Sequence, residues 1–331
     1  MQTDRNTWRR AARAGLAAAV MLSGSAVTGA AQAQTYPVKP IRIVVPFAPG
    51  GPNDILARIV GQKLTEAWNQ QVIVENRPGG GTVIGTEIVA KSPPDGYTLL
   101  MVSTSHTTNP TLVSKLPFDT LRDLAPVILV ASSANVVVSH PSLPAKSVKE
   151  LIAVARSRPD QVAYASGGNG TSTHLAGAML ALMGGVRMIH VPYKGGGPAT
   201  IALLGGEITW MVGTIIPPLP HIRSGRLRAL AVTGAQRTQV LPDVPTVAES
   251  LPGFEANGWY GISTQGATPK DLIARLNQEI ARGLNTGDTR ARLAAEATEI
   301  VGGSPEQFGA FFKAEIEKWA RVIKNVGLRP E

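Results

Sequence analysis

The 331-residue sequence contains no cysteine, and only 5% of its residues are aromatic. Without cysteine the chain has no disulfide, no thiolate metal site and no thiol nucleophile, so its stability must come from a hydrophobic core. Nucleotide-binding glycine motifs, the G-x-S-x-G hydrolase elbow and the H-E-x-x-H zinc motif are missing as well. The five histidines also lack metal-ligand spacing. We therefore expect neither a metal nor a cofactor, and no catalytic residues.

The first residues are typical of an export signal. Four arginines precede a small apolar run from Ala14 to Ala31, and Ala31-Gln32-Ala33 fits the small-x-small cleavage rule. We predict a signal peptide over residues 1–33, cleaved after Ala33, and a periplasmic mature protein. The alternative is an uncleaved anchor helix, although the run is poor in strongly apolar residues. Arg9-Arg10 leaves both general secretion and twin-arginine export open.

The mature chain would carry 28 Lys and Arg against 22 Asp and Glu, a net charge of +6. These basic residues are dispersed, without a cluster of five or six and without interleaved aromatics. Nucleic-acid binding is therefore disfavoured. Weak attraction of small anions, or solubility alone, explains the charge.

Short β-rich runs alternate with helical stretches along the mature chain, which predicts α/β architecture with parallel sheets covered by helices. Several runs are apolar without alternation, as in strands buried on both faces. The expected strands are Ile41–Val45, Val72–Glu75, Tyr97–Val102, Val127–Val130, Val136–Ser139, Val162–Ala165, Met188–Val191, Ile208–Val212, Leu227–Val232 and Trp259–Ser263.

Helix starts and lobe limits follow from local signals. An amphipathic helix is expected after Asn53, and hydroxyl caps at Ser147, Thr268 and Ser304 predict three more. The remaining 298 residues suit two lobes. Chain crossings near 130–140 and 255–262 would make residues 34–134 and 256–331 lobe 1, and residues 135–255 lobe 2.

Four strands end in Gly- or Pro-rich loops that open a helix, at residues 46–54, 76–82, 166–174 and 192–198. Ligands of open parallel sheets lie beyond the carboxyl ends of the strands. Glycines let backbone N–H groups approach closely, and helix N-termini favour anions. Hydroxyls such as Thr82, Ser105 and Thr171 add neutral donors. The pattern predicts a carboxylate site, although any single loop could be a plain turn.

Several polar residues near these loops have two interpretations each. Asp54 either caps its helix or orients the Gly50-Gly51 loop, and His106 is expected in the loop after Tyr97–Val102. His174 is either a structural histidine or a ligand contact. Lys194 either attracts an anion or is an exposed loop lysine.

The segment Pro46-Phe47-Ala48-Pro49-Gly50-Gly51-Pro52-Asn53-Asp54 resembles the P-F-x-P-G-G-x-x-D signature of tripartite tricarboxylate transporter substrate-binding proteins, the Bug family. Further matching segments follow in order and cover essentially the whole mature chain. They are Val74–Gly81, Pro94–Leu100, Ala165–Leu175, Val191–Gly195, Gly225–Thr233 and Leu241–Thr246.

The resemblance implies a type II periplasmic-binding-protein fold: two α/β lobes, mostly parallel sheets and a crossed-strand hinge. It implies a receptor that delivers a small mono- or dicarboxylate to a membrane permease. We expect a monomer, and no enzymatic activity, because none of the catalytic constellations is visible. The alternative is a sensor that signals to a two-component kinase. Backbone amides and waters would hold the carboxylate between the loops 47–51 and 167–174. The expected ligand-binding residues are Phe47, Ala48, Pro49, Gly50, Gly51, Asp54, Thr82, Ser105, His106, Gly167, Gly170, Thr171, His174, Lys194 and Gly213.

One departure from the family pattern concerns the ligand's distal end. Many members carry Asp in the strand end aligned with Ile208–Thr214, whereas Gly213-Thr214 follows Met211-Val212 here. An amino acid's ammonium group would lose a partner at this position. The sequence therefore favours an acid whose tail is uncharged or a second carboxylate.

Overall fold

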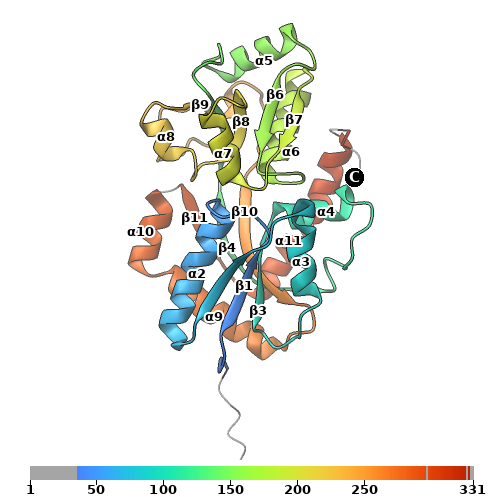
Figure 1. The fold of residues 1–331 in the computed structure, drawn as a ribbon, viewed down its shortest axis with the longest axis vertical. Coiled ribbons are helices and arrows are strands. Elements are labelled where there is room, and N and C mark those ends of the chain that lie inside the picture. Colours follow the sequence, from blue (N-terminus) through green and yellow to red (C-terminus); the bar gives the residue numbers. More distant parts are fainter. Residues whose placement is uncertain (1–35, 296, 326, 329–331) are drawn as a thin grey trace, which may run out of the picture. The chain divides into compact units, whose positions relative to one another are not determined.

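The computed structural model describes residues 36–295, 297–325 and 327–328. The predicted signal peptide and its cleavage site lie outside these residues. From Pro37 onward the chain forms one compact unit, which contains two sheets with their helices (Figure 1). Among the described helices, none is long and apolar enough to cross a membrane.

Lobe 1 is built on a six-stranded sheet in the order β11-β4-β10-β3-β1-β2. Both ends of the chain contribute to it. Its strands are β1 (Ile41–Val45), β2 (Val72–Asn76), β3 (Thr98–Ser103), β4 (Leu124–Ser133), β10 (Gly258–Gln265) and β11 (Thr298–Gly302). Its helices are α2 (Pro52–Trp68), α3 (Val83–Ala90), α4 (Thr104–Leu112), α9 (Lys270–Leu284), α10 (Gly287–Ala295) and α11 (Pro305–Asn325), with a 3-10 turn, η1, at Gly80–Thr82.

Lobe 2 is built by the middle of the chain on a five-stranded sheet in the order β7-β6-β8-β5-β9. Its strands are β5 (Asn135–Ser139), β6 (Ala163–Ser166), β7 (Ile189–Pro192), β8 (Trp210–Thr214) and β9 (Arg228–Val232). Its helices are α5 (Val148–Ser157), α6 (Ser172–Gly184), α7 (Gly196–Leu204) and α8 (Leu219–Arg223), with a 3-10 turn, η2, at Val247–Glu249.

The chain crosses between the lobes where β4 runs into β5 and where residues 255–257 lead into β10. Asn135 ties these crossings together. Its backbone N–H donates to Thr233 Oγ1 at 2.9 Å, and its side-chain amide donates to the Ala256 carbonyl at 2.7 Å. Asn135 and Thr233 are fully buried, so the hinge is a dry, hydrogen-bonded junction. The predicted limits of lobes 1 and 2 fall at these crossings. The assignment of residues to two separate lobes stays a prediction.

Both sheets are mixed, which corrects the expectation of mostly parallel sheets. Strands of the strand–loop–helix units pair in parallel, as in β1 with β2 and β3, and β6 with β7 and β8. The strands beside the crossings pair antiparallel: β10 with β3 and β4, and β5 with β8 and β9. A strand that enters a lobe through the hinge runs against its neighbours, because no helix returns the chain to the same edge.

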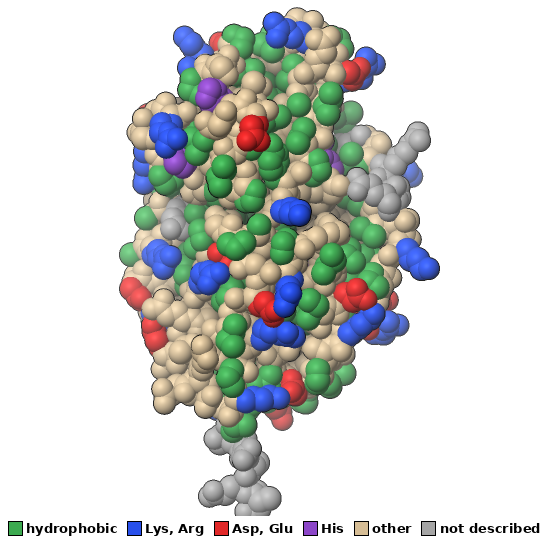
Figure 2. Space-filling model, viewed as in Figure 1, with side chains coloured by type: hydrophobic (Ala, Val, Ile, Leu, Met, Phe, Trp, Pro, Cys, Tyr) green, Lys and Arg blue, Asp and Glu red, His purple; other side chains and the backbone are tan. Residues whose placement is uncertain are grey.

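Local signals identified most elements but not all. Every expected strand is present, and Ser304 caps α11 by accepting the Gln307 N–H at 3.2 Å. Thr268 does not cap α9, because that helix begins one residue later than expected, at Lys270 after Pro269. Strand β11 was not expected. On the face in Figure 2, basic and acidic side chains are interspersed, and no large patch of one sign forms.

Candidate binding site

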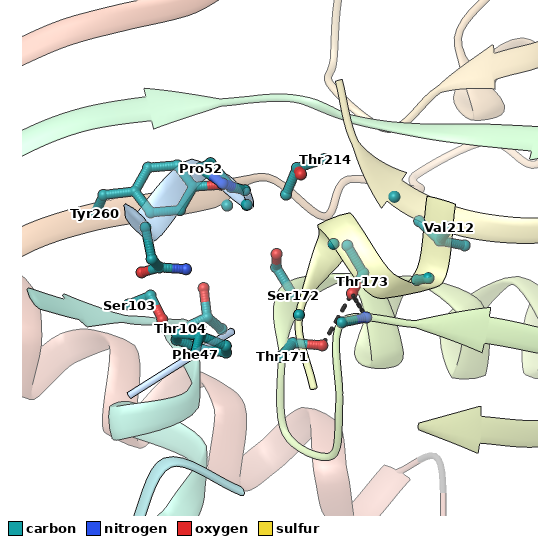
Figure 3. A pocket seen from close by; sticks show the side chains of 18 of the residues that line it. Phe47, Pro52, Ser103, Thr104, Thr171, Ser172, Thr173, Val212, Thr214 and Tyr260 are labelled. Atoms are coloured by element: carbon teal, nitrogen blue, oxygen red, sulfur yellow. Dashed lines mark hydrogen bonds between the residues drawn. The ribbon is translucent and has the colours of Figure 1, made fainter. Parts of the chain in front are cut away.

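A cavity of about 40 Å³ lies where loops of lobe 1, loops of lobe 2 and strand β10 meet (Figure 3). We call it the inner chamber. Lobe 1 contributes the loop after β1 and the start of α4, and lobe 2 contributes the loops before α6 and α7. The lining residues are Phe47, Gly51, Pro52, Asn53, Ser103, Thr104, Gly167, Thr171, Ser172, Thr173, Gly195, Gly196, Ala199, Val212, Gly213, Thr214, Gly258, Trp259 and Tyr260.

Four helices begin at the inner chamber. The N-cap residues of α2, α4, α6 and α7 all line it; they are Gly51, Ser103, Thr171 and Gly195. Each helix N-terminus carries unpaired N–H groups and roughly half a positive charge. None of the described lining residues is charged. The chamber therefore attracts a negative group by main-chain dipoles alone.

Four buried polar atoms of the lining have no hydrogen-bond partner within the protein: Asn53 Oδ1, Thr104 Oγ1, Thr214 Oγ1 and Tyr260 OH. The labelled side chains of Thr104, Thr214 and Tyr260 come from three different elements and surround the same space (Figure 3). Burial raises the pKa of the Tyr260 phenol, so this group stays a donor. Buried hydroxyls without partners are costly, and a bound acceptor would satisfy them.

A second, larger space of about 180 Å³ adjoins the inner chamber, and we call it the outer chamber. The two share Phe47, Gly167 and Thr171 in their linings. The outer chamber is bounded by the loop of residues 78–82, whose three glycines have positive φ angles that other residues rarely adopt. Lys194 is the only charged side chain among its described lining residues.

The two lobes touch around these chambers. The Ala48 N–H of lobe 1 donates to the Lys194 carbonyl of lobe 2 at 2.9 Å, and Thr108 Oγ1 donates to the Gly170 carbonyl at 2.8 Å. A Cβ on Gly197 of lobe 2 would lie 3.1 Å from the Pro49 carbonyl oxygen of lobe 1, which is tighter than an ordinary contact. The glycines thus allow the facing loops to approach closely, and the lobes are closed over the cavity.

Comparison with known proteins decides the family. Residues 56–328 match the model of the tripartite tricarboxylate transporter family receptor. The chain belongs to this family. BugT of Bordetella pertussis is 37% identical to the receptor over 94% of this chain and 96% of BugT. The resemblance seen in the sequence motifs is confirmed.

Solved structures confirm the fold class. R. palustris Rpa4515 with adipate has a TM-score of 0.87 and 33% identity, covering 89% of the receptor and 100% of that chain. MatC (Rpa3494) from Rhodopseudomonas palustris with bound malate has a TM-score of 0.83 and 30% identity, covering 87% of the receptor and 100% of that chain. The receptor therefore has the two-lobe type II fold of periplasmic binding proteins.

The residues expected at the site fall into three groups. Phe47, Gly51, Gly167, Thr171 and Gly213 line the inner chamber, and Thr82 and Lys194 line the outer chamber. The remaining eight line neither chamber: Ala48, Pro49, Gly50, Asp54, Ser105, His106, Gly170 and His174.

Asp54 supports the first loop from behind. Its buried carboxylate accepts hydrogen bonds from the Gly50 N–H at 3.1 Å, from Arg58 at 2.9 Å and from Asn76 at 3.0 Å. Burial works to raise its pKa, but the hydrogen bonds from Arg58, Gly50 and Asn76 outweigh burial and hold the pKa below its ordinary value. Asp54 thus stays ionised and fixes the loop that lines the chamber.

His106 does not lie in a loop but in helix α4, which corrects the sequence-based expectation. Its Nδ1 accepts the N–H of Ser103, the N-cap residue, at 3.1 Å, so the ring closes the start of the helix. Burial lowers the pKa of His106 to about 4, which keeps the ring neutral. His106 therefore supports the wall of the inner chamber from outside it, whereas Ser105 is fully buried beside it with an unpaired Oγ.

His174 has a comparable role in lobe 2. Its Nδ1 accepts the Gly170 N–H at 3.2 Å, and its ring stacks on His190 with centroids 3.8 Å apart. His190 Nε2 in turn lies 2.6 Å from Ser166 Oγ. Burial lowers the pKa of His174 to about 4, and burial with the nearby His174 lowers that of His190 to about 3. Two neutral histidines thus hold the loop that carries Gly167.

The sequence reasoning missed the hydroxyl and amide groups that converge on the inner chamber. Asn53, Thr104, Thr214 and Tyr260 come from four elements that meet only in the folded protein. Position at a predicted helix N-terminus could have identified Asn53, whereas Thr104 begins a helix that the sequence does not signal. No local signal marks Thr214 in β8 or Tyr260 in the hinge strand.

Proposed function

We propose that the receptor binds a small organic carboxylate in the inner chamber. The observation that carries this is the convergence of four helix N-termini and three unpaired hydroxyls on a space without a charged side chain. Main-chain N–H groups and neutral hydroxyls can donate to both carboxylate oxygens. A cationic ligand would meet the positive ends of these helices and find no acidic partner among the described lining residues.

The volumes of the two chambers suggest how the ligand lies. A space of about 40 Å³ holds a headgroup, and the outer chamber of about 180 Å³ receives the rest of the molecule. Lys194 would accompany a second carboxylate there, and Phe47, shared by both chambers, would contact an apolar chain. Acids of four to six carbons with one or two carboxylates fit this arrangement. The adipate and malate named for Rpa4515 and MatC support the same class.

The biological role proposed is export to the periplasm, followed by capture of the acid and delivery to a tripartite-type permease. Membership of the receptor family supports it, and BugD, a periplasmic binding protein, is a structural neighbour with a TM-score of 0.86. Chemistry on the ligand would require an acid, base or nucleophile poised in the cavity. Because the family is one of receptors, we expect the protein to release the acid unchanged. Mass spectrometry of the periplasmic protein should find Gln34 at its N-terminus. Loss of acid uptake on deletion of the gene should be restored by the intact gene.

A thermal-shift screen tests the ligand class. Mature protein is heated with monocarboxylates, malate, adipate, amino acids, amines and sugars. A ligand at 100 times its Kd should stabilise the fold by about 2.7 kcal/mol. We expect shifts with mono- or dicarboxylates, followed by titration calorimetry. A shift with amines or sugars and none with acids would contradict the proposal.

A further inference from the structure

Helix α11 of lobe 1 carries a buried carboxylate that joins two tryptophans. Glu315 is only 7% exposed, and its Oε2 accepts the indole N–H of Trp259 at 2.9 Å and that of Trp319 at 2.7 Å. Its Oε1 accepts from Lys318 Nζ at 3.1 Å. Hydrogen bonds to an ionised acceptor are stronger than neutral ones, so both rings are held firmly.

The two rings lie in functionally different places. Trp259 belongs to the hinge strand β10 and is among the residues that line the inner chamber, and its ring packs edge-on against Phe308, Phe311 and Phe312. Trp319, with no exposed surface, belongs to an apolar cluster with Leu112, Leu175 and Ile323. One carboxylate therefore bonds to a residue that lines the ligand cavity and to a residue of a second, separate packing site.

The apolar cluster joins the two lobes. Leu112 and Trp319 belong to lobe 1, whereas Leu175 and the partly buried Met179 belong to helix α6 of lobe 2. The C-terminal part of α11 rises beside the lobe 2 sheet's helix α6 (Figure 1). Separation of the lobes would expose this face of Trp319 to water, so the cluster favours the closed state.

We infer that Glu315 is a positioning residue that couples the wall of the ligand cavity at Trp259 to the interlobe contact at Trp319. Helix α6 starts at the inner chamber with Thr171 and reaches Trp319 through Leu175 one turn later. Lobe closure and placement of the Trp259 wall therefore depend on the same carboxylate. The inference deepens the proposed function and rests on it for the ligand, but the closure step can be measured without one.

The test uses Glu315→Gln in the full mature protein. The amide oxygen that replaces Oε2 is a neutral acceptor, so both indole bonds lose their charged partner, and the NH2 group that replaces Oε1 faces the Lys318 ammonium, another donor. Because the chain has no cysteine, Lys91→Cys and Lys149→Cys can carry one spin label on each lobe without competing thiols. The interlobe distance distribution is recorded without ligand and with adipate and malate. Affinities are measured on unlabelled protein.

We expect Glu315→Gln to move the distance distribution towards longer distances and to weaken binding of whichever acid the wild type takes by at least tenfold. The matched control is Glu317→Gln, the same change at an exposed position of the same helix, which should leave both measurements as in the wild type. Trp319→Phe keeps an aromatic, although smaller, ring in the cluster and removes one indole N–H. It should shift the interlobe distances in the same direction. If Glu315→Gln does not fold, this variant tests whether the indole bond to Glu315 affects lobe closure.

A lower melting temperature with wild-type distances would make Glu315 a stability determinant only and overturn the inference. Failure of the wild type to bind any acid would contradict the proposed function instead. The distances measured without ligand would still decide the closure role of Glu315.

Discussion

Three unpaired hydroxyls define the inner chamber at the residue scale. Thr104, Thr214 and Tyr260 each bury an oxygen that no protein group satisfies. Such a group costs about 1–3 kcal/mol when it lacks a partner, and a hydrogen bond to a charged acceptor contributes about as much. The protein therefore holds these donors at a cost that a carboxylate bound as we propose would remove.

Removal of these hydroxyls should separate affinity from stability. We expect Tyr260→Phe and Thr214→Val, which keep the shape of the side chain, to weaken carboxylate binding about 10-fold or more, a loss of at least about 1.4 kcal/mol. Thermal stability without ligand should stay equal or rise, because an unsatisfied group is gone. Calorimetry gives the first quantity and thermal melts give the second.

Thr120 provides the control. Its hydroxyl is also buried without a partner, but it does not line either chamber. Thr120→Val should therefore leave affinity unchanged. Equal affinities in wild type, Tyr260→Phe and Thr214→Val would show that the hydroxyls do not touch the ligand.

Gly177 lies in the interior of α6, where the ring of Tyr164 covers the helix. An added Cβ would lie 2.1 Å from Tyr164 Cε2, a distance that real Cβ atoms do not show. Gly309 in α11 offers a matched comparison, since its Cβ would make an ordinary contact at 3.6 Å with Pro126. The same substitution thus meets opposite surroundings in two helices.

Alanine at these two positions should have opposite effects on the free energy of unfolding. Alanine in a helix interior is about 1 kcal/mol better than glycine, so Gly309→Ala should stabilise by about that amount. In Gly177→Ala the clash should outweigh this gain and destabilise by about 1–3 kcal/mol. Urea denaturation measures both. Stabilisation by both variants would mean that Tyr164 moves aside freely.

At the scale of elements, the sequence predicts what is local. The strand–loop–helix units around residues 46–52 and 166–173 are contiguous, so their turn chemistry and caps could be read directly. Helix α4 could not be predicted from its sequence, because it is rich in threonine and contains Pro110, and both residue types are unfavourable in a helix interior. It is stabilised by the ring of His106 and by packing against α11, and neither is visible as a helix signal.

Strand β11 was missed for a related reason. It is short, its apolar residues Ile300 and Val301 are adjacent and do not alternate with polar ones, and it is stabilised by antiparallel pairing with β4 at the sheet edge. The polar lining of the inner chamber was missed because Thr214 in β8 and Tyr260 in β10 are far apart in the sequence and surround the same space only in the folded protein (Figure 3). Long-range contacts of this kind leave no period in the sequence.

At the scale of the whole molecule, both lobes use a neutral buried histidine to hold a loop of the cavity. His106 accepts the Ser103 N–H in lobe 1, and His174 accepts the Gly170 N–H in lobe 2. Protonation of either Nδ1 would turn an acceptor into a donor facing a donor. Acid should therefore disturb the cavity and the fold through the same atoms.

The pH dependence has a definite sign. The folded pKa values of His106, His174 and His190 lie at about 4, 4 and 3, below the unfolded value of about 6.5. Between pH 6.5 and 4 the unfolded chain binds protons that the folded protein does not, so stability rises with pH. This contribution is complete above pH 6.5 and is lost as pH falls towards 4. Asp54, whose pKa is held below its ordinary value, adds its loss only at lower pH.

We expect the urea midpoint to fall steadily from pH 7 to pH 4.5. The affinity for the carboxylate depends on the folded protein, whose histidines stay neutral over this range, so it should fall only towards pH 4. His190→Gln keeps a hydrogen-bonding group beside Ser166 and removes one titrating ring. The slope of its unfolding free energy against pH should therefore be lower than that of the wild type by up to about 1.4 kcal/mol per pH unit. His221→Gln on the surface helix α8 should keep the wild-type slope. Identical slopes in all three proteins would mean that the stacked pair in lobe 2 accepts protons without loosening its loop. The acid sensitivity would then have to arise from the carboxylates and to begin only near pH 4.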